Sequence, residues 1–355
     1  MPVFRVLGDR VLTRAEFVAQ RSDAVILEST AEAHPLAESF AAPTEVDSAP
    51  GATQFEPIGP GRPLTILIRH VYTGKHPKTV LGGGRDMVVV TGLKDYATFA
   101  ASSRAVNYLQ KNIKPETNFG APNVFTDGTN VVAYSPAVLT DSFHFTVEIA
   151  FDRFPDQLMN TISKGLGSLA GIPLMIPAQG YLLAASSLVK IGSDWADALV
   201  DGRAVFSITD SIDFNIPGVA PSAADFRVLA NFDASGLRYV PGKGLVGADD
   251  KPYAGEEPYV VISLDGAARK NLEGFAPSIA TAAVLKQFFS MRDGAEASID
   301  AMISAFRLAN DLKYRQEAKS LQAAIAVESD QKKKGELTAR LEAVNKNILT
   351  TELKP

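Results

Sequence analysis

Residues 142–152 show a two-residue alternation of apolar and polar side chains. Because side chains on a β-strand point to opposite faces in turn, the alternation predicts a strand with one buried and one solvated face. Such strands are typical of antiparallel sheets, whereas both faces of a parallel sheet are usually buried. The apolar positions are Phe143, Phe145, Val147, Ile149 and Phe151.

Further strands are predicted from the same alternation or from short apolar runs between turn residues. They cover residues 64–71, 87–90, 130–135, 206–216, 226–232 and 259–264. The connections between them are rich in Gly, Pro, Asp and Asn, which favours hairpins and loops over crossover helices. We therefore expect an α+β protein with an antiparallel β-sandwich-like domain over residues 64–265.

A helical hairpin is expected as an insertion in this domain, at residues 155–201. Pro155 suits the first turn of a helix that places Leu158, Ile162 and Leu166 one turn apart. A second helix is predicted from Pro177 to Val200.

Another helix is predicted earlier in the same domain. Asp95 can cap it, and Phe99, Val106, Leu109 and Ile113 would share one side.

After Asp265 the sequence pattern is helical, which predicts a C-terminal helical region over residues 266–355. One helix is expected at residues 277–291, and a longer one from Ala295 carries Ile299, Met302, Phe306 and Ala309 on one side. Gly335 is interpreted as the turn before the last helix. That helix would place Leu337, Leu341, Val344 and Ile348 at heptad steps of four, three and four.

These four residues, the C-terminal stripe, are the predicted interaction site. They would dock on a protein partner, on a second copy, or on the chain's own β domain, as an antiparallel helical hairpin or coiled-coil arm. An isolated helix of two turns is marginal without a packing surface.

The N-terminal part divides into two segments. Residues 1–32 predict a strand and a short helix, and residues 33–63 contain six prolines with an excess of acidic side chains. This second segment is interpreted as an extended arm or linker.

Residues 165–189 form a stretch of 25 residues without a formal charge. About 20 apolar residues suffice to cross a bilayer, but Pro173 and Pro177 each remove a backbone donor in the middle of the stretch. The favoured interpretation is a buried element, and the alternative is insertion into a membrane after a trigger. The membrane-facing side chains would be Leu166, Leu174, Ile176, Leu182, Leu183 and Leu188.

Recognisable catalytic and cofactor motifs are weak in this sequence. The four histidines, His34, His70, His76 and His144, have no metal-ligand spacing, and cysteine is absent. Residues 242–247 match G-x-G-x-x-G, but a loop rich in Asp, Glu and Pro follows where a helix must begin. They are therefore interpreted as a hairpin loop, and no catalytic, cofactor-binding or metal site is predicted.

Acidic side chains supply the remaining candidates for chemistry. Asp249, Asp250, Glu256 and Glu257 crowd one loop and suit either Ca²⁺ or a solvated turn. Asp210 interrupts the apolar face of its strand, which indicates a bulge or a buried, hydrogen-bonded carboxylate.

Charge and composition bound the class of function. A net charge of -5 and a pI near 5.5 give no general attraction for nucleic acid. The absence of cysteine fits a reducing cytoplasm, the expected location. We expect a non-enzymatic protein–protein interaction or scaffold protein, without cofactor or small-molecule substrate. The alternatives are a latent membrane-active protein that uses residues 155–200, and an enzyme with a composite site.

Overall fold

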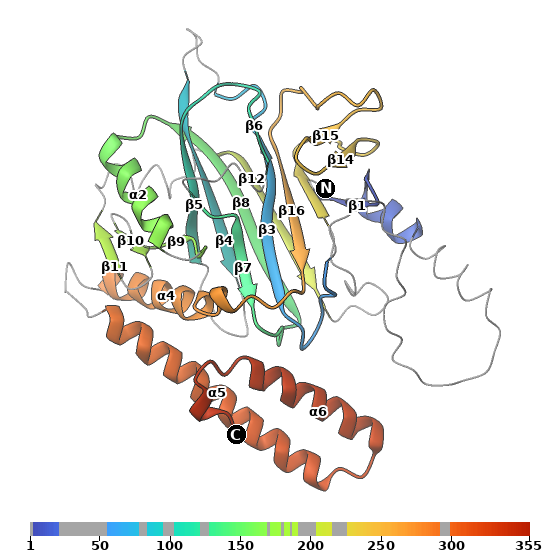
Figure 1. Ribbon diagram of the computed structural model, residues 1–355, viewed down its shortest axis with the longest axis vertical. Coiled ribbons are helices and arrows are strands. Elements are labelled where there is room, and N and C mark those ends of the chain that lie inside the picture. The colour runs from blue at the N-terminus through green and yellow to red at the C-terminus, as the bar shows by residue number, and fades with distance from the viewer. Residues whose placement is uncertain are drawn as a thin grey trace, which may run out of the picture.

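The chain is a mixed α/β protein with two antiparallel sheets and a helical C-terminal region (Figure 1). The computed structural model describes residues 3–20, 55–77, 84–94, 103–120, 128–168, 171–178, 181–184, 187–190, 204–214, 226–291 and 299–355. A short helix also lies at residues 14–20, directly after the second strand.

The first sheet contains strands from both the beginning and the end of the strand-rich part of the chain. Each described pairing between its strands is antiparallel, and β7 pairs with β3 beside β6. In spatial order the strands are β15 (Gly244–Val246), β14 (Arg238–Val240), β2 (Arg10–Leu12), β1 (Val3–Leu7), β13 (Phe226–Ala230), β16 (Tyr259–Asp265), β3 (Leu64–Tyr72) and β6 (Asn118–Gly120), with β7 (Val131–Ser135).

The second sheet is also antiparallel throughout its described pairings. Its strands in spatial order are β11 (Ser187–Lys190), β10 (Tyr181–Ala184), β9 (Leu174–Ala178), β5 (Ser103–Ile113), β4 (Arg85–Lys94), β8 (Ser142–Asp152) and β12 (Ala204–Asp213). Helix α2 (Asp156–Ser168) covers the β5–β9–β10 end of this sheet (Figure 1).

One hydrophobic cluster, the shared core, takes side chains from both sheets. It combines Ile66 and Ile262 of the first sheet with Val89 and Phe145 of the second. Burial of apolar surface contributes roughly 25 cal/mol per Å², so this cluster is the main stabilising contact between the sheets. The alternation predicted for residues 142–152 is confirmed, because every second residue from Phe143 to Ile149 is buried.

Helix α4 (Phe275–Met291) closes one end of the shared core, and α5 packs against it (Figure 1). Phe275, Ile279 and Leu285 belong to the shared core. The neighbouring hydroxyls bond within the helix, from Ser278 to the carbonyl of Gly274 at 2.9 Å and from Thr281 to that of Pro277 at 2.8 Å. A helix that is apolar on all sides is expected where both faces are covered.

The C-terminal region consists of α5 (Ile299–Val327) and α6 (Gln331–Lys346), with the 3-10 turns η1 (Lys270–Leu272) before α4 and η2 (Thr351–Leu353) after α6. Arg340 pairs with Glu317 at 2.8 Å, and the Asn310 amide reaches the Asn347 carbonyl at 3.4 Å. Residue numbers rise along one helix as they fall along the other. The two helices therefore form an antiparallel hairpin, which we call the arm.

The helix predicted after Asp95 is wrong where the structure describes it, because residues 103–113 form strand β5. Val89 pairs with Tyr108 and Val90 with Val106, so Asn107 is an extra, bulged residue. A bulge shifts the alternation by one, which places residues three apart on the same face. Val106 and Leu109 consequently show helix-like spacing while they belong to a strand. Residues 95–102 lie outside the described residues.

The inserted helical hairpin is also wrong in the described part of its second half, and residues 191–201 lie outside the described residues. Helix α2 is present, but strands β9, β10 and β11 occupy the described part of residues 174–190. Leu182 packs in the cluster under α2, whereas Leu183 packs in the shared core. A strand that buries both faces in this way reads as a continuous apolar run, so tertiary packing overrides the local preference for helix.

The turn predicted at Gly335 is misplaced, since Gly335 lies within α6 and is exposed. The connection between α5 and α6 falls at residues 328–330 instead. The Asp330 carboxylate accepts hydrogen bonds from the backbone N–H groups of Lys332 and Lys333, at 2.8 and 3.2 Å. An aspartate N-cap therefore begins the helix five residues earlier than glycine indicated.

Two buried polar side chains tie the sheets together at separate points. Arg227 of β13 donates from one terminal nitrogen to the carboxylate of Asp210 on β12, at 2.5 Å, and to the carbonyl of Ser211 at 3.2 Å. Its side chain is only 1% exposed, and that of Asp210 is 14% exposed. The expected hydrogen-bonded carboxylate at Asp210 is thus confirmed, with its partner on the opposite sheet.

Asn107, the bulged residue of β5, provides the second tie. Its amide nitrogen donates to the carbonyls of Thr129 and Val131, at 3.3 and 2.8 Å, and its amide oxygen accepts from the Thr91 hydroxyl at 2.7 Å. The bulge therefore aims a polar side chain at the segment that enters β7 of the first sheet.

We predict that Asp210→Ala lowers the free energy of unfolding by about 3–5 kcal/mol, because it removes the carboxylate that the buried Arg227 guanidinium contacts. Urea unfolding at neutral pH measures this change. Thr209→Ala on the same strand removes an exposed hydroxyl that bonds to the Thr146 hydroxyl at 2.7 Å, and serves as the control, with an expected loss below about 1 kcal/mol. Equal losses in the two variants would contradict the role of the buried pair.

Candidate interaction surface

The inner face of α5 packs against other parts of the chain. Met302 packs against the shared core, while Tyr314 and Ala318 form a small cluster with Val344 and Ile348. A helix of 29 residues is about 44 Å long, so only part of it can rest on α4. The remainder is supported by α6.

The C-terminal stripe faces this inner side. Val344 and Ile348 are buried, Leu341 is partly buried against the same cluster, and Leu337 lies toward the tip of the arm with intermediate exposure. Ile348 follows the end of α6, where the chain turns back along α5. The heptad spacing therefore serves a contact inside the chain, with α5 as the partner helix.

Two buried polar residues anchor the base of the arm. The Asp311 carboxylate is fully buried and accepts hydrogen bonds from the backbone N–H groups of Leu349 and Thr350, each at 3.0 Å. The Asn347 side chain donates to the carbonyl of Ala137 in the β7–β8 connection at 3.0 Å. These bonds fix the C-terminal segment to both α5 and the β region.

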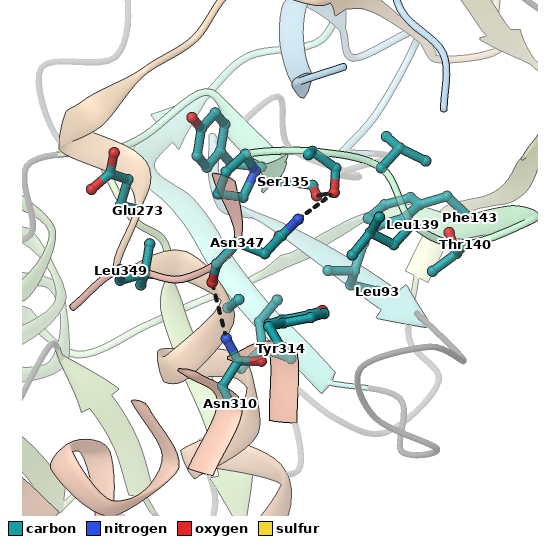
Figure 2. A pocket seen from close by; sticks show the side chains of 16 residues that line it. Leu93, Ser135, Leu139, Thr140, Phe143, Glu273, Asn310, Tyr314, Asn347 and Leu349 are labelled. Carbon is teal, nitrogen blue, oxygen red and sulfur yellow. Dashed lines mark hydrogen bonds between the residues drawn. The ribbon is translucent and has the colours of Figure 1, made fainter. Parts of the chain in front are cut away.

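A cavity of about 50 Å³ lies at this junction, between the β7–β8 connection, α4 and the C-terminal segment. Figure 2 shows Asn347 in its wall, bonded toward Asn310 on one side and toward the β7–β8 connection on the other. Its lining includes Tyr134, Glu273, Tyr314 and Leu349. Pockets for organic ligands usually measure roughly 300–1,000 Å³, so this space suits water molecules.

The opposite face of α5 carries four exposed apolar residues in a line. Ala301, Ala305, Leu308 and Leu312, which we call the outer stripe, follow one another at steps of four, three and four. Leu308 is 49% exposed and Leu312 is 46% exposed. Single exposed leucines are common on protein surfaces, but an aligned set on one helix face is typical of a docking surface.

The sequence pattern pointed to another set on α5. Of that set, Met302 and Phe306 are partly buried as expected, while Ala309 is exposed. The outer stripe has the same heptad spacing as the C-terminal stripe, and that spacing was the signal that could have revealed it.

The proposed membrane residues lie mostly in packed positions. Leu166, Leu174, Ile176 and Leu182 belong to the cluster under α2, and Leu183 belongs to the shared core. Leu188 lies in β11, and its side chain is outside the described set. None of the described helices combines the length and the apolar composition needed to cross a bilayer.

The histidines are dispersed rather than gathered into one site. His70 lies in β3, His144 lies in β8, and His76 precedes Pro77 and stacks on Phe151. His34 falls outside the described residues. In the part of the chain that is described, no three acidic or histidine side chains are arranged to hold a metal ion.

The acidic loop forms ion pairs with nearby cations. Asp249 pairs with Lys251 at 2.9 Å, Glu256 pairs with Lys75 at 2.8 Å, and Asp250 pairs with Arg238. Residues 241–243 connect β14 to β15, which pair antiparallel, so the interpretation of residues 242–247 as part of a hairpin is confirmed.

His70 is a buried neutral group inside an aromatic cluster. Its side chain is 1% exposed, it stacks on Tyr259, and its Nε2 lies 2.9 Å from the Asn118 amide oxygen. Its Nδ1 has no hydrogen-bond partner among the described residues. Burial lowers the pKa of His70, and the bond to Asn118 offsets this only partly.

The chain was compared with protein-family models, with curated protein sequences and with solved structures, and none of them matches it. The function must therefore be inferred from the surface and its geometry.

We predict that Asp311→Asn releases the C-terminal segment, because an amide oxygen replaces a carboxylate that accepts two buried backbone hydrogen bonds. The expected cost is about 1–3 kcal/mol of unfolding free energy. Hydrogen exchange at residues 347–355 should accelerate in this variant. Glu342→Gln, an exposed change on α6, is the control, and similar exchange in both variants would contradict the anchoring role.

We predict that stability falls as the pH drops below about 6.5, the ordinary pKa of histidine. In this window the unfolded chain binds a proton at His70 before the folded chain does, so the unfolding free energy rises with increasing pH and levels off above the window. Urea unfolding between about pH 5.5 and pH 7.5 measures the slope. His70→Gln should reduce the slope, whereas an unchanged slope in this variant would exclude His70 as its source.

Proposed function

We propose that this chain is a non-enzymatic cytoplasmic interaction protein. In this proposal a β-sandwich-like domain holds the helical arm, and the outer face of the arm docks onto another protein molecule. The docking role remains with the C-terminal helices, as the sequence led us to expect, but it moves from the C-terminal stripe to the outer stripe.

The observation that carries the proposal is the outer stripe itself. Both α4 and α6 pack on the other side of α5, and yet Leu308 and Leu312 remain about half exposed. Covering an exposed leucine side chain fully contributes roughly 1.5–3 kcal/mol, so two leucines and two alanines offer a useful contact area. Heptad spacing suits a helix as the element that covers them.

The anchoring of the arm supports the same conclusion. Asp311 and Asn347 fix its base through buried hydrogen bonds, and Arg340 pairs with Glu317 between its two helices. A surface held in place before binding loses less conformational entropy on association than a flexible one. The arm therefore holds the outer stripe in a fixed position before a partner binds.

The membrane-active alternative stays a prediction without a favouring observation. The described apolar side chains of residues 155–200 already pack in hydrophobic clusters. Exposing them would cost the free energy that their burial now contributes.

The test places a photo-crosslinking amino acid at position 308 of the full-length chain in cells. We expect ultraviolet light to produce covalent adducts that contain a second protein molecule, because the outer stripe would lie against it.

A probe at position 342, on the exposed side of α6, is the matched control and should give few adducts. Equal yields at both positions, or none at position 308, would contradict docking through the outer stripe.

A further inference from the structure

The spacing of the outer stripe is the same in both directions along α5. The steps from Ala301 to Leu312 are four, three and four, so the pattern is symmetric about a point between Phe306 and Arg307. Two such helices placed antiparallel with this point in common would set Ala301 against Leu312, and Ala305 against Leu308. Each layer would then combine one small and one large side chain, which fills space evenly between helices 8–10 Å apart.

A parallel arrangement of two α5 helices fits less well. It would set Leu308 against Leu308 and Ala301 against Ala301, so that some layers are crowded and others are left open. Poorly filled layers lose contact energy, because interiors are packed to crystal-like density.

The charges at the two ends of the outer stripe favour the antiparallel arrangement as well. At about 100° of rotation per residue, Asp300 and Arg315 lie on the same flank of the outer stripe. Asp300 is exposed, and Arg315 is partly exposed, with an Nε that has no hydrogen-bond partner among the described residues. Antiparallel pairing brings Arg315 of each copy beside Asp300 of the other. In a parallel two-fold pair the same flanks of the two helices lie on opposite sides of the interface, so Asp300 and Arg315 would stay apart.

We propose that the partner of the outer stripe is a second copy of this chain, with the two α5 helices antiparallel about a two-fold axis between Phe306 and Arg307. This inference rests on the proposed docking function and names the molecule that docks. A two-fold interface uses the same patch on both copies, so the patch must be complementary to itself. The outer stripe meets this condition in both side-chain size and charge.

The first experiment measures self-association of the purified full-length chain by sedimentation velocity over a range of concentrations. We expect a monomer–dimer equilibrium, and Leu308→Glu with Leu312→Glu should weaken it by about 100-fold or more, because four carboxylates would enter the interface. Circular dichroism and urea unfolding check that this variant is folded. A wild-type chain that remains monomeric at several hundred micromolar would overturn the inference.

A charge exchange tests the pairing without touching the apolar residues. Asp300→Arg alone and Arg315→Asp alone should each weaken the dimer by about 10-fold, and the variant that carries both should regain most of the affinity. Failure of the combined variant to recover, while both single variants are weakened, would contradict the proposed contact between positions 300 and 315.

Engineered cysteines decide the direction of the helices, since the natural chain has none. In an equimolar mixture of Ala301→Cys and Leu312→Cys chains, mild oxidation should join position 301 to position 312 of the other copy. In the antiparallel pair, two 301 positions lie about 16 Å apart along the axis, too far for a disulfide. Mainly 301–301 and 312–312 products would overturn the antiparallel arrangement.

The outcomes separate this inference from the proposed function. If the purified chain is monomeric but position 308 still crosslinks to a different protein in cells, docking stands and the second copy is excluded. If position 308 gives no adduct and the chain is monomeric, both proposals fail.

Discussion

The shared core between the two sheets is the contact on which the rest of the structure depends. The β8 side chains Phe143, Phe145, Val147 and Ile149 all bury their apolar groups in it, opposite strands of the first sheet. Helix α4 packs against one end of this core, and α5 packs against α4. The position of the arm is therefore set, through α4, by the same hydrophobic contact that joins the sheets.

The shared core supplies most of the stabilising free energy, and buried polar side chains fix the relative positions of the elements. Two contacts join one sheet to the other: Arg227 with Asp210, and Asn107 with the backbone of β7. Buried hydrogen bonds of Asp311 and Asn347 likewise hold the base of the arm in place. A buried polar group is costly unless its partners are in place, so each bond penalises alternative arrangements of the elements. The apolar clusters alone would allow more sliding between layers.

The two heptad patterns of the arm have opposite uses. Val344 and Ile348 of the C-terminal stripe are buried against α5, whereas Leu308 and Leu312 of the outer stripe remain partly exposed. The first pattern stabilises the hairpin and gives the second a fixed support. The proposed association of two copies then uses the exposed leucines Leu308 and Leu312 on the face of α5 that turns away from α6.

The local sequence pattern was sufficient to predict elements that have one buried face and one solvated face. The strand at residues 142–152 has one face in the shared core and one partly solvated, so its alternation was visible in the sequence. Helices α2, α5 and α6 were visible for the same reason. The hydrogen-bonded carboxylate at Asp210 was also indicated, because a charge on an apolar strand face requires a partner.

Tertiary structure decided the elements that are buried on both faces, and it decided which of two similar stripes is covered. The bulge at Asn107 gave β5 a helix-like spacing, and the two buried faces of β10 hid its alternation. Heptad spacing indicates a face on which another helix can pack, but it does not identify that helix. That choice depends on the short connection at residues 328–330 and on the anchors Asp311 and Asn347, which bring α6 to one side of α5 and leave the outer stripe free of it.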